Sequence, residues 1–159
     1  TAAPYVHNSN RNSYYDGDGI LMKETVIIEE GIIKNIYSTH RYADYLNIKP
    51  TGALRNSIIK GGKHTEAELR ETPYLEVISF SAFQMDALAG FFGGEFRLAL
   101  YHDGKNVIPV TQGAVTANLK DAQKTMWFSK ETVNSINIVT PKIIKFDKKY
   151  YNFNTLILR

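Results

Sequence analysis

Few side chains in this sequence have the types and spacing that catalysis or metal binding needs. The chain has four histidines, His7, His40, His64 and His102. None has a second histidine four residues away, as a zincin helix requires, and there is no Gly-x-Ser-x-Gly elbow and no P-loop. The acidic residues close to glycines are Asp86, Glu95 and Asp103. Spacing alone brings no two of these together, so the sequence predicts no catalytic residue and no metal site in this chain.

An Asp/Gly run near the start of the chain superficially resembles a calcium-binding loop. Residues 16–19 read Asp-Gly-Asp-Gly, but the remaining oxygen ligands and the closing glutamate of an EF-hand loop are absent. Aspartate and glycine are also strong turn formers. We therefore interpret this run as a turn.

The segment at residues 90–99, GFFGGEFRLA, combines three glycines with a strand pattern. Phe96, Leu98 and Leu100 occupy alternate positions of the expected strand. Glycines at a strand entrance are typical of a bulge, a sharp bend or the close approach of another backbone. The functional alternative is an open strand edge, to which an extended peptide adds through backbone hydrogen bonds.

The whole-chain properties fit one globular domain spanning residues 1–159. The length of 159 residues suits a single domain, and 43% hydrophobic with 22% charged residues excludes disorder as the main state. Zero cysteine excludes disulfides, zinc ribbons and a thiol nucleophile, and it fits a reducing, cytoplasmic compartment. The chain begins with Thr1 instead of Met, which is expected of a processed chain or of a piece of a longer protein.

The charge pattern and hydropathy disfavour two classes of partner. The formal net charge is only +3, and the densest basic group is Lys142, Lys145, Lys148 and Lys149, which we interpret as a solvated face. Aromatic residues are not interleaved with clustered Lys and Arg, so we do not expect nucleic acid as a partner. No apolar run approaches the roughly 18–20 residues that a bilayer span needs, so we expect no membrane partner.

The predicted elements are many short strands and a few short helices. Residues 1–19 form an irregular lead-in. A hairpin is predicted from strands at 24–28 and 32–37 around Glu29-Glu30-Gly31. Helices are predicted after Thr39 to about Leu46, with Tyr42, Ala43 and Leu46 on one face, and over residues 65–70, where Thr65 and Glu68 have capping-box spacing. Further strands are expected at residues 57–60, 74–83, 95–102, 107–111, 115–119, 136–146 and 153–158.

This order of elements predicts an α+β domain dominated by strands. The strands are mostly antiparallel, because glycine-containing turns separate many of them. They are expected to form a folded sheet or a barrel-like domain with a few short helices. The stretch from 121 to 133 is ambiguous and is expected to be partly helical.

Several motifs in order resemble the TldD/PmbA (TldE) family, once described as modulators of DNA gyrase. They are YDGDGI at 15–20, TGALR at 51–55, FGGEFRLA at 92–99, IPVTQG at 108–113, ANL at 117–119 and TPKII at 140–144. No single motif is decisive, but they are collinear and cover nearly the whole chain. The resemblance implies that this chain is the C-terminal domain of such a protein.

The resemblance implies a relation to metal-dependent proteolysis. TldD-type subunits carry a His-Glu-x-x-x-His zinc motif upstream of this region and a cysteine ligand in the C-terminal domain. They pair with TldE-type subunits, which lack the metal ligands, and the complexes process unfolded peptides. The implied partners are therefore an unfolded peptide substrate and a homologous subunit, in a homodimer or a heterodimer.

This sequence departs from the family pattern in three ways. The helix with paired histidines is absent, the cysteine ligand is absent, and Phe91 replaces an acidic residue of the glycine-rich motif. The first two departures mean that the chain by itself lacks the family's zinc ligands, so no cofactor is expected in it. The chain is metallopeptidase-related, and its sequence leaves its own enzymatic activity undecided.

The interpretation we favour is a non-catalytic, TldE-like domain that shapes a peptide cleft and a subunit interface. The residues expected there are Gly93, Gly94, Glu95 and Arg97, with Gly52 and Arg55 as a second group. Each group also has an explanation that involves no function. The glycines can be required by the backbone geometry, and Glu95 and Arg97 can be ordinary polar residues on a solvent-exposed strand face. Two other functions stay open: a fragment of an intact zinc metallopeptidase whose metal site lies upstream, and a DNA- or gyrase-associated protein.

Overall fold

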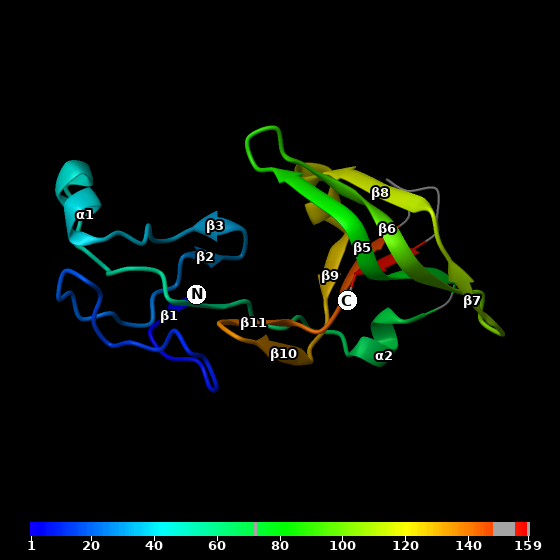
Figure 1. Ribbon diagram of the computed structural model, residues 1–159, viewed down its shortest axis with the longest axis horizontal. Helices are drawn as coiled ribbons and strands as arrows, with labels where there is room; N and C mark the ends of the chain where they lie inside the picture. Colours follow the sequence, from blue (N-terminus) through cyan, green and yellow to red (C-terminus); the bar gives the residue numbers. More distant parts are fainter. Residues whose placement is uncertain (72, 148–154, 159) are drawn as a thin grey trace. The chain divides into compact units, whose positions relative to one another are not determined.

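The computed structural model describes residues 1–71, 73–147 and 155–158 (Figure 1). Its contacts divide the chain into two compact units. Unit 1 comprises Thr1–Lys60 and Thr132–Thr140, and unit 2 comprises Gly61–Glu131 and Pro141–Arg159. That residues 1–159 act as one domain stays a prediction. Lys148 and Lys149 of the predicted basic face lie outside the described residues.

Unit 1 is built on a four-stranded sheet of short strands. The strands follow the order β1 (Ala2–Ala3), β4 (Asn56–Ile58), β11 (Ile138–Pro141) and β10 (Thr132–Ser135). β1 pairs with β4 in antiparallel fashion, and β11 pairs with β4 in parallel. The lead-in at residues 1–19 is irregular apart from β1 and an isolated bridge at Tyr15, as predicted.

A buried asparagine attaches the irregular lead-in to this sheet. Asn56 is fully buried, and its amide nitrogen donates to the carbonyl oxygens of Ala3 and Pro4 at 3.2 Å. Its amide oxygen accepts from the hydroxyl of Ser9 at 2.6 Å. A segment without regular structure must satisfy its backbone groups in this way, because buried polar groups without partners are costly.

The predicted hairpin and first helix of unit 1 are present but differ in detail. β2 (Ile28–Glu29) and β3 (Ile32–Ile33) have two residues each, and Glu30 and Gly31 make the turn with φ of 51° and 77°. Positive φ at both turn residues is the type I′ geometry that suits a two-residue hairpin. The strands are shorter than the sequence predicts.

Helix α1 (His40–Leu46) has the predicted bounds, with Thr39 at its N-cap position. Of the three residues predicted to lie on one face, only Ala43 is buried. Tyr42 and Leu46 are 61% and 54% exposed. The helix therefore presents large apolar side chains on the surface of unit 1.

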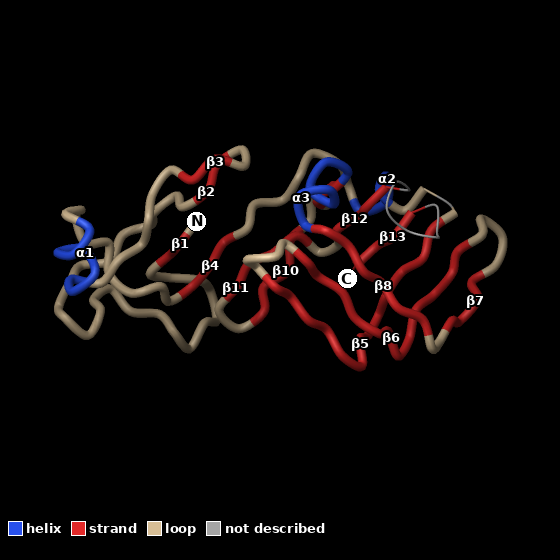
Figure 2. The backbone as a smooth tube through the Cα atoms, turned by 90° about the horizontal axis from the view of Figure 1, so that it is seen from above, coloured by secondary structure: helices blue, strands red, loops and turns tan. Residues whose placement is uncertain are grey.

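Unit 2 contains a seven-stranded mixed sheet (Figures 1 and 2). The order is β7 (Val107–Val110), β6 (Phe91–His102), β5 (Tyr74–Asp86), β13 (Thr155–Leu158), β12 (Ile144–Asp147) and β9 (Met126–Phe128), with β8 (Gly113–Asn118) also on β6. All pairs are antiparallel except β13 with β5, which is parallel. No sheet of the described residues closes into a barrel, so the α+β, strand-dominated prediction is confirmed in its folded-sheet form.

The helices of unit 2 are short. α2 (Glu66–Leu69) begins with the predicted capping box, in which Thr65 accepts from the backbone of Glu68 and the Glu68 carboxylate accepts from the backbone of Thr65. α3 (Leu119–Ala122) and the 3-10 turn η1 (Gln123–Thr125) lie in the stretch that the sequence left ambiguous. No helix of the described residues is long and apolar enough to cross a membrane.

The predicted strand over 136–146 is two strands in the structure. β11 ends at Pro141 and belongs to the sheet of unit 1, whereas β12 begins at Ile144 and belongs to the sheet of unit 2. Proline has no N–H to donate to a ladder, and it therefore favours a strand end. A single apolar run in the sequence hides this change of sheet.

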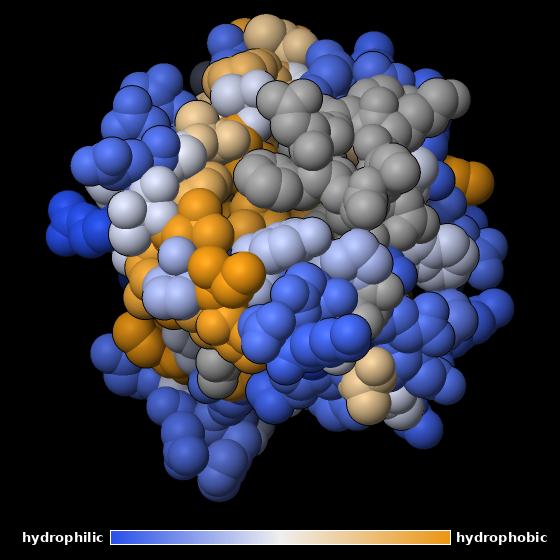
Figure 3. All heavy atoms as spheres, turned by 90° about the vertical axis from the view of Figure 1, so that its right-hand side faces the viewer, coloured by the Kyte–Doolittle hydropathy of each residue, from blue (hydrophilic) through white to orange (hydrophobic). Residues whose placement is uncertain are grey.

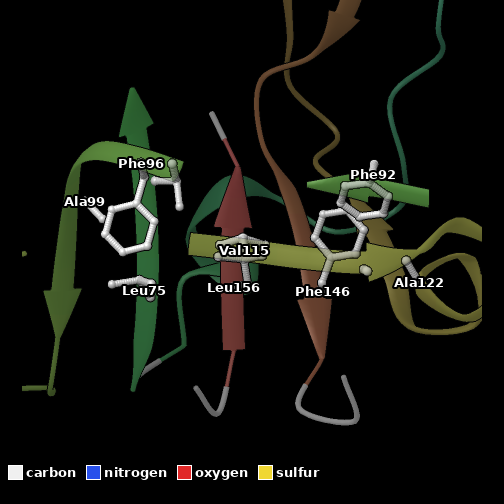
Figure 4. Packing of buried hydrophobic residues seen from close by; sticks show 10 residues of the cluster. Leu75, Phe92, Phe96, Ala99, Val115, Ala122, Phe146 and Leu156 are labelled. Atoms are coloured by element: carbon white, nitrogen blue, oxygen red, sulfur yellow. The ribbon is translucent and has the colours of Figure 1, made fainter. Parts of the chain in front are cut away.

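The larger hydrophobic cluster of unit 2 packs on one face of the seven-stranded sheet, and a smaller buried cluster consists of Leu69, Tyr74, Ile143 and Ile157. Figure 4 shows the side chains of the larger cluster converging from β5, β6, β8, β12, β13 and α3: Leu75, Phe92, Phe96, Ala99, Val115, Ala122, Phe146 and Leu156. The rings of Phe92 and Phe146 pack 6.0 Å apart between centroids. Full burial of a valine, leucine or phenylalanine side chain contributes about 1.5–3 kcal/mol. On the side of unit 2 that Figure 3 presents, apolar surface is also exposed.

β6 does not follow the alternation that the sequence predicts. Phe96 and Ala99 are both buried, whereas Leu98 is 37% exposed. The pairing of β5 with β6 shifts register between Val77 and Ala82, where bulges interrupt the ladder. An extra residue in one strand reverses which side chains face the core. The expected run of Phe96, Leu98 and Leu100 on one face is therefore wrong.

Candidate functional site

Glu95 and Arg97 are the charged residues of the glycine-rich strand. They lie near a junction, the point on one edge of β6 where pairing with β8 ends and pairing with β7 begins. β8 pairs with β6 over residues 91–96, and β7 pairs with it over residues 99–102. Arg97 and Leu98 fall between these two ladders. The chain passes from β7 to β8 through a short link in which Gln112 has a left-handed φ of 60°. Such a conformation is uncommon for a residue other than glycine, and it marks a locally constrained backbone.

A pocket of about 440 Å³ opens at this junction. It is lined by Ser81, Glu95, Phe96, Arg97, Thr111, Gln112, Gly113 and Ala114. Its volume lies within the range of roughly 300–1,000 Å³ that is typical of ligand sites. Glu95 and Arg97 are exposed, and within the described ranges neither side chain makes an ion pair. The pocket thus offers one carboxylate and one guanidinium to a ligand.

Gly93 and Gly94 are explained by the sheet itself. A Cβ on Gly93 would lie 2.7 Å from the carbonyl oxygen of Val115, and a Cβ on Gly94 would collide with the carbonyl oxygen of Ala82. These oxygens belong to the strands on either side of β6. The close approach of another backbone, one of the explanations offered from sequence, is therefore the reason for both glycines. A part in a peptide cleft or an interface stays a prediction for them.

The functional alternative for this strand, an open edge, does not hold for residues 91–96. β5 pairs with one edge of residues 91–96 and β8 pairs with the other. A peptide therefore has no free edge of β6 to join there. In the described part of the chain β8 pairs with β6 alone, so its other edge has no strand partner among the described residues. Sequence reasoning missed this, because the β8 segment has no signal that distinguishes an edge strand from an inner one.

The second predicted group, Gly52 and Arg55, lies in unit 1. Gly52 has a φ of 85°, and a Cβ there would collide with Cγ of Met22. Its N–H donates to the carbonyl of Ser38 at 2.9 Å. Gly52 is therefore required by the backbone. Arg55 is half-buried, and its Nε is buried with no hydrogen-bond partner among the described residues.

Asp16 is a buried acidic residue of unit 1 that the sequence identified only as part of a turn. The turn is confirmed, since Oδ1 accepts from the backbone N–H groups of Asp18 and Ile20 at 2.9 Å. Oδ2 is buried and makes no hydrogen bond within the described residues. It lies 3.5 Å from the position of a Cβ on Gly52, so the Asp/Gly turn packs against the 51–55 loop.

A charged cluster inside unit 2, which the sequence analysis did not identify, joins α2 to the sheet. Glu76 on β5 is 4% exposed and accepts two hydrogen bonds from the guanidinium of Arg70, at 2.6 and 2.7 Å. The ring of His102 stacks on Tyr74 at 4.3 Å between centroids, with Nε2 3.6 Å from the Glu76 carboxylate. The sequence gives one sign of this cluster, which is that Glu76 is a single glutamate within a run of mostly apolar strand residues.

The same cluster includes Glu66 at the start of α2. Its carboxylate pairs with Lys142 at 2.5 Å and with Arg70 at 3.0 Å. The hydrogen bond from Lys142 and, more weakly, that from Arg70 hold the pKa of the Glu66 carboxyl below its ordinary value of 4.5, although burial opposes this. Hydrogen bonds to Glu76 raise the pKa of Arg70. The ion pairs of Arg70, Glu66, Glu76 and Lys142 connect α2 to the sheet and to the segment before β12.

The described residues provide no ligand set for the zinc that the resemblance implies. No group of three or more His, Asp or Glu side chains lies together there in an arrangement that could hold a metal ion. Zinc sites need three or four such ligands around one point. No step of a metal-dependent reaction is therefore assigned to these residues.

Comparison with known sequences decides the family. The chain matches the family model described as the PmbA/TldA metallopeptidase C-terminal domain over residues 1–148. The chain belongs to this family. The resemblance read from the motifs is thereby confirmed. No curated protein matches the chain.

Two crystal structures share the fold of this PmbA/TldA C-terminal domain. A Thermotoga maritima protein described as a candidate modulator of a DNA gyrase is 15% identical, with a TM-score of 0.72 over 90% of this chain. TldE from Thermococcus kodakarensis is 17% identical, with a TM-score of 0.75 over 99% of this chain. The matches cover 36% and 39% of those two chains. At 15% and 17% identity, the similarity to these two structures shows a shared fold and nothing further.

Proposed function

We propose that this domain is a non-catalytic, TldE-like part of a peptide-processing metalloprotease complex, in which it holds unfolded peptide and contacts a homologous subunit. The observation that carries the proposal is the pocket between the β7 and β8 ladders, where Glu95 and Arg97 lie without ion-pair partners among the described residues. The family and the fold shared with TldE support it. The absence of cysteine is compatible with a cytoplasmic location for the complex.

The chemistry of the junction suits an extended peptide better than a compact ligand. The outer edge of β8 can supply backbone donors and acceptors to a strand laid beside it. Ala114 and Thr116 point to the exposed face of that edge strand, whereas Val115 and Ala117 are buried. Arg97 and Glu95 lie on β6, one strand in from that edge, and line the pocket, where they can engage peptide side chains that reach back across β8. Hydrogen bonds to the peptide backbone would accept peptides of many sequences. The charges of Glu95 and Arg97 would favour one direction of the bound peptide.

Peptide binding by charge-removing variants tests this proposal. We expect Arg97→Ala to weaken the binding of a labelled, extended, uncharged peptide about tenfold, which corresponds to roughly 1.4 kcal/mol. Fluorescence anisotropy on the full chain measures the affinity. The matched control is Arg41→Ala on α1, because Arg41 is also exposed and lies outside the pocket.

The results that contradict the proposal are equally definite. Equal affinity for Arg97→Ala, Arg41→Ala and the unchanged chain would remove the pocket from peptide binding. Stoichiometric zinc in the full-length parent, lost when an upstream histidine is replaced, would instead support the intact metallopeptidase. Binding to DNA at low salt, where nonspecific electrostatic binding is strongest, would favour the gyrase-associated alternative.

A further inference from the structure

Unit 1 contains a groove of about 930 Å³ that lies outside the residues discussed so far. Three segments line it: the end of the Asp/Gly turn at residues 19–25, the chain leaving the hairpin at 33–36, and the loop after α1 at 48–51. These segments are far apart in sequence, and all belong to unit 1. The groove is therefore a product of the fold and not of one loop.

The charges of the lining have a single sign. Lys23, Lys34 and Lys49 line the groove, and no aspartate or glutamate does. Lys34 lies 3.8 Å from Glu29, which partly offsets its charge. Lys23 and Lys49 are exposed and make no ion pair in the part of the chain that the structure describes. Each comes from a different segment, so the positive charge is spread along the groove.

The rest of the lining is largely apolar. Leu21, Ile33, Ile36 and Ile48 all line the groove, and all are exposed. Clustered exposed apolar side chains beside charged ones mark binding surfaces more often than an ordinary solvated face. An occupant must therefore offer both carboxylates and apolar groups.

We infer that this groove binds a peptide segment in which acidic and apolar side chains are mixed. Several carboxylates along one chain match ammonium groups spread over three segments better than a single anionic group does. Nucleic acid fits less well, because the lining contains no aromatic side chain and no arginine on which a base could stack. The inference rests on the proposed function in that it names the class of peptide the domain handles.

A panel of labelled peptides on the full chain tests the inference. The probe is a peptide of leucine and glutamate separated by glycine, and its two controls carry lysine or serine in place of glutamate. We expect the acidic peptide to bind most tightly, with an affinity that falls as salt rises, because exposed charge pairs are screened. The double variant Lys23→Gln, Lys49→Gln should weaken its binding by about tenfold, or roughly 1.4 kcal/mol.

The matched control is the double variant Lys105→Gln, Lys120→Gln, which removes two exposed lysines of unit 2 and should leave binding unchanged. Equal binding of the acidic and basic peptides, or no effect of Lys23→Gln, Lys49→Gln, overturns the inference. So does a short single-stranded DNA that displaces the acidic peptide at equal concentration. If the acidic peptide binds no more tightly than the serine peptide, and the binding of both depends on Arg97, only this inference fails. If no peptide binds, the proposed function fails with it.

Discussion

At the residue scale, local signals were predictable when the interacting groups are close in sequence. The capping box of Thr65 and Glu68 spans three residues, and the structure confirms both of its hydrogen bonds. The cluster around Glu76 was not predictable, because His102 is brought to it by the pairing of Tyr74 with His102 across two strands. Glu95 and Arg97 were identified from the sequence as candidate site residues. The pocket that they line was not predictable, because it depends on where β7 ends and β8 begins.

Glu66 makes the stability of unit 2 depend on pH. Its pKa in the folded state is below the ordinary value of 4.5, so the folded state binds a proton less readily than the unfolded state does. The stabilisation is therefore complete above the unfolded pKa and is lost as pH falls through the folded pKa. We expect the free energy of unfolding to decrease as pH falls below about 4.5, and Glu66→Gln to reduce that dependence.

Urea unfolding at a series of pH values measures this effect. The control is Glu24→Gln, since Glu24 is exposed and makes no ion pair within the described residues. The same pH dependence for Glu66→Gln and for the unchanged chain would exclude Glu66 as the source.

At the element scale, the sequence predicted most strands but not their registers or partners. The β-branched and aromatic runs predicted the start of β5 and the end of β6, but β5 extends to Asp86 instead of residue 83 and β6 begins at Phe91 instead of residue 95. The bulges between Val77 and Ala82 leave no clear mark in the sequence, yet they decide that Ala99 and not Leu98 is buried. The edge position of β8 follows from long-range pairing, which periodicity does not report.

Gly94 tests the close packing of β5 against β6. A Cβ at this position would collide with the carbonyl oxygen of Ala82, which belongs to the backbone and cannot rotate away. We expect Gly94→Ala to lower the free energy of unfolding by about 1–3 kcal/mol, as overpacking does. Urea denaturation followed by circular dichroism gives the value.

Gly17→Ala is the matched control for Gly94→Ala. A Cβ on Gly17 meets no atom within 4 Å, and its φ is not in the left-handed region. This control should be neutral or slightly stabilising, because alanine restricts the unfolded chain. A neutral Gly94→Ala would mean that the two strands lie farther apart than described.

At the scale of the whole molecule, the strand-dominated α+β class was predictable from the order of elements, whereas the division into two compact units was not. The run at residues 136–146 contributes one strand to each unit, and a local pattern cannot reveal that change of sheet. The pocket lined by Glu95 and Arg97 lies in unit 2, and the lysine-lined groove lies in unit 1. Each is complete within its own unit, so each can be tested by variants that leave the other unchanged.

We propose above that this PmbA/TldA C-terminal domain holds peptide without a metal of its own. The most direct measurement is the affinity of the full chain for an extended labelled peptide, with zinc and with a chelator in excess, followed by mass analysis of the peptide. We expect the same affinity in both conditions and an intact peptide. Binding that is lost in chelator and restored by zinc, or cleavage of the peptide by this chain, would contradict the proposal.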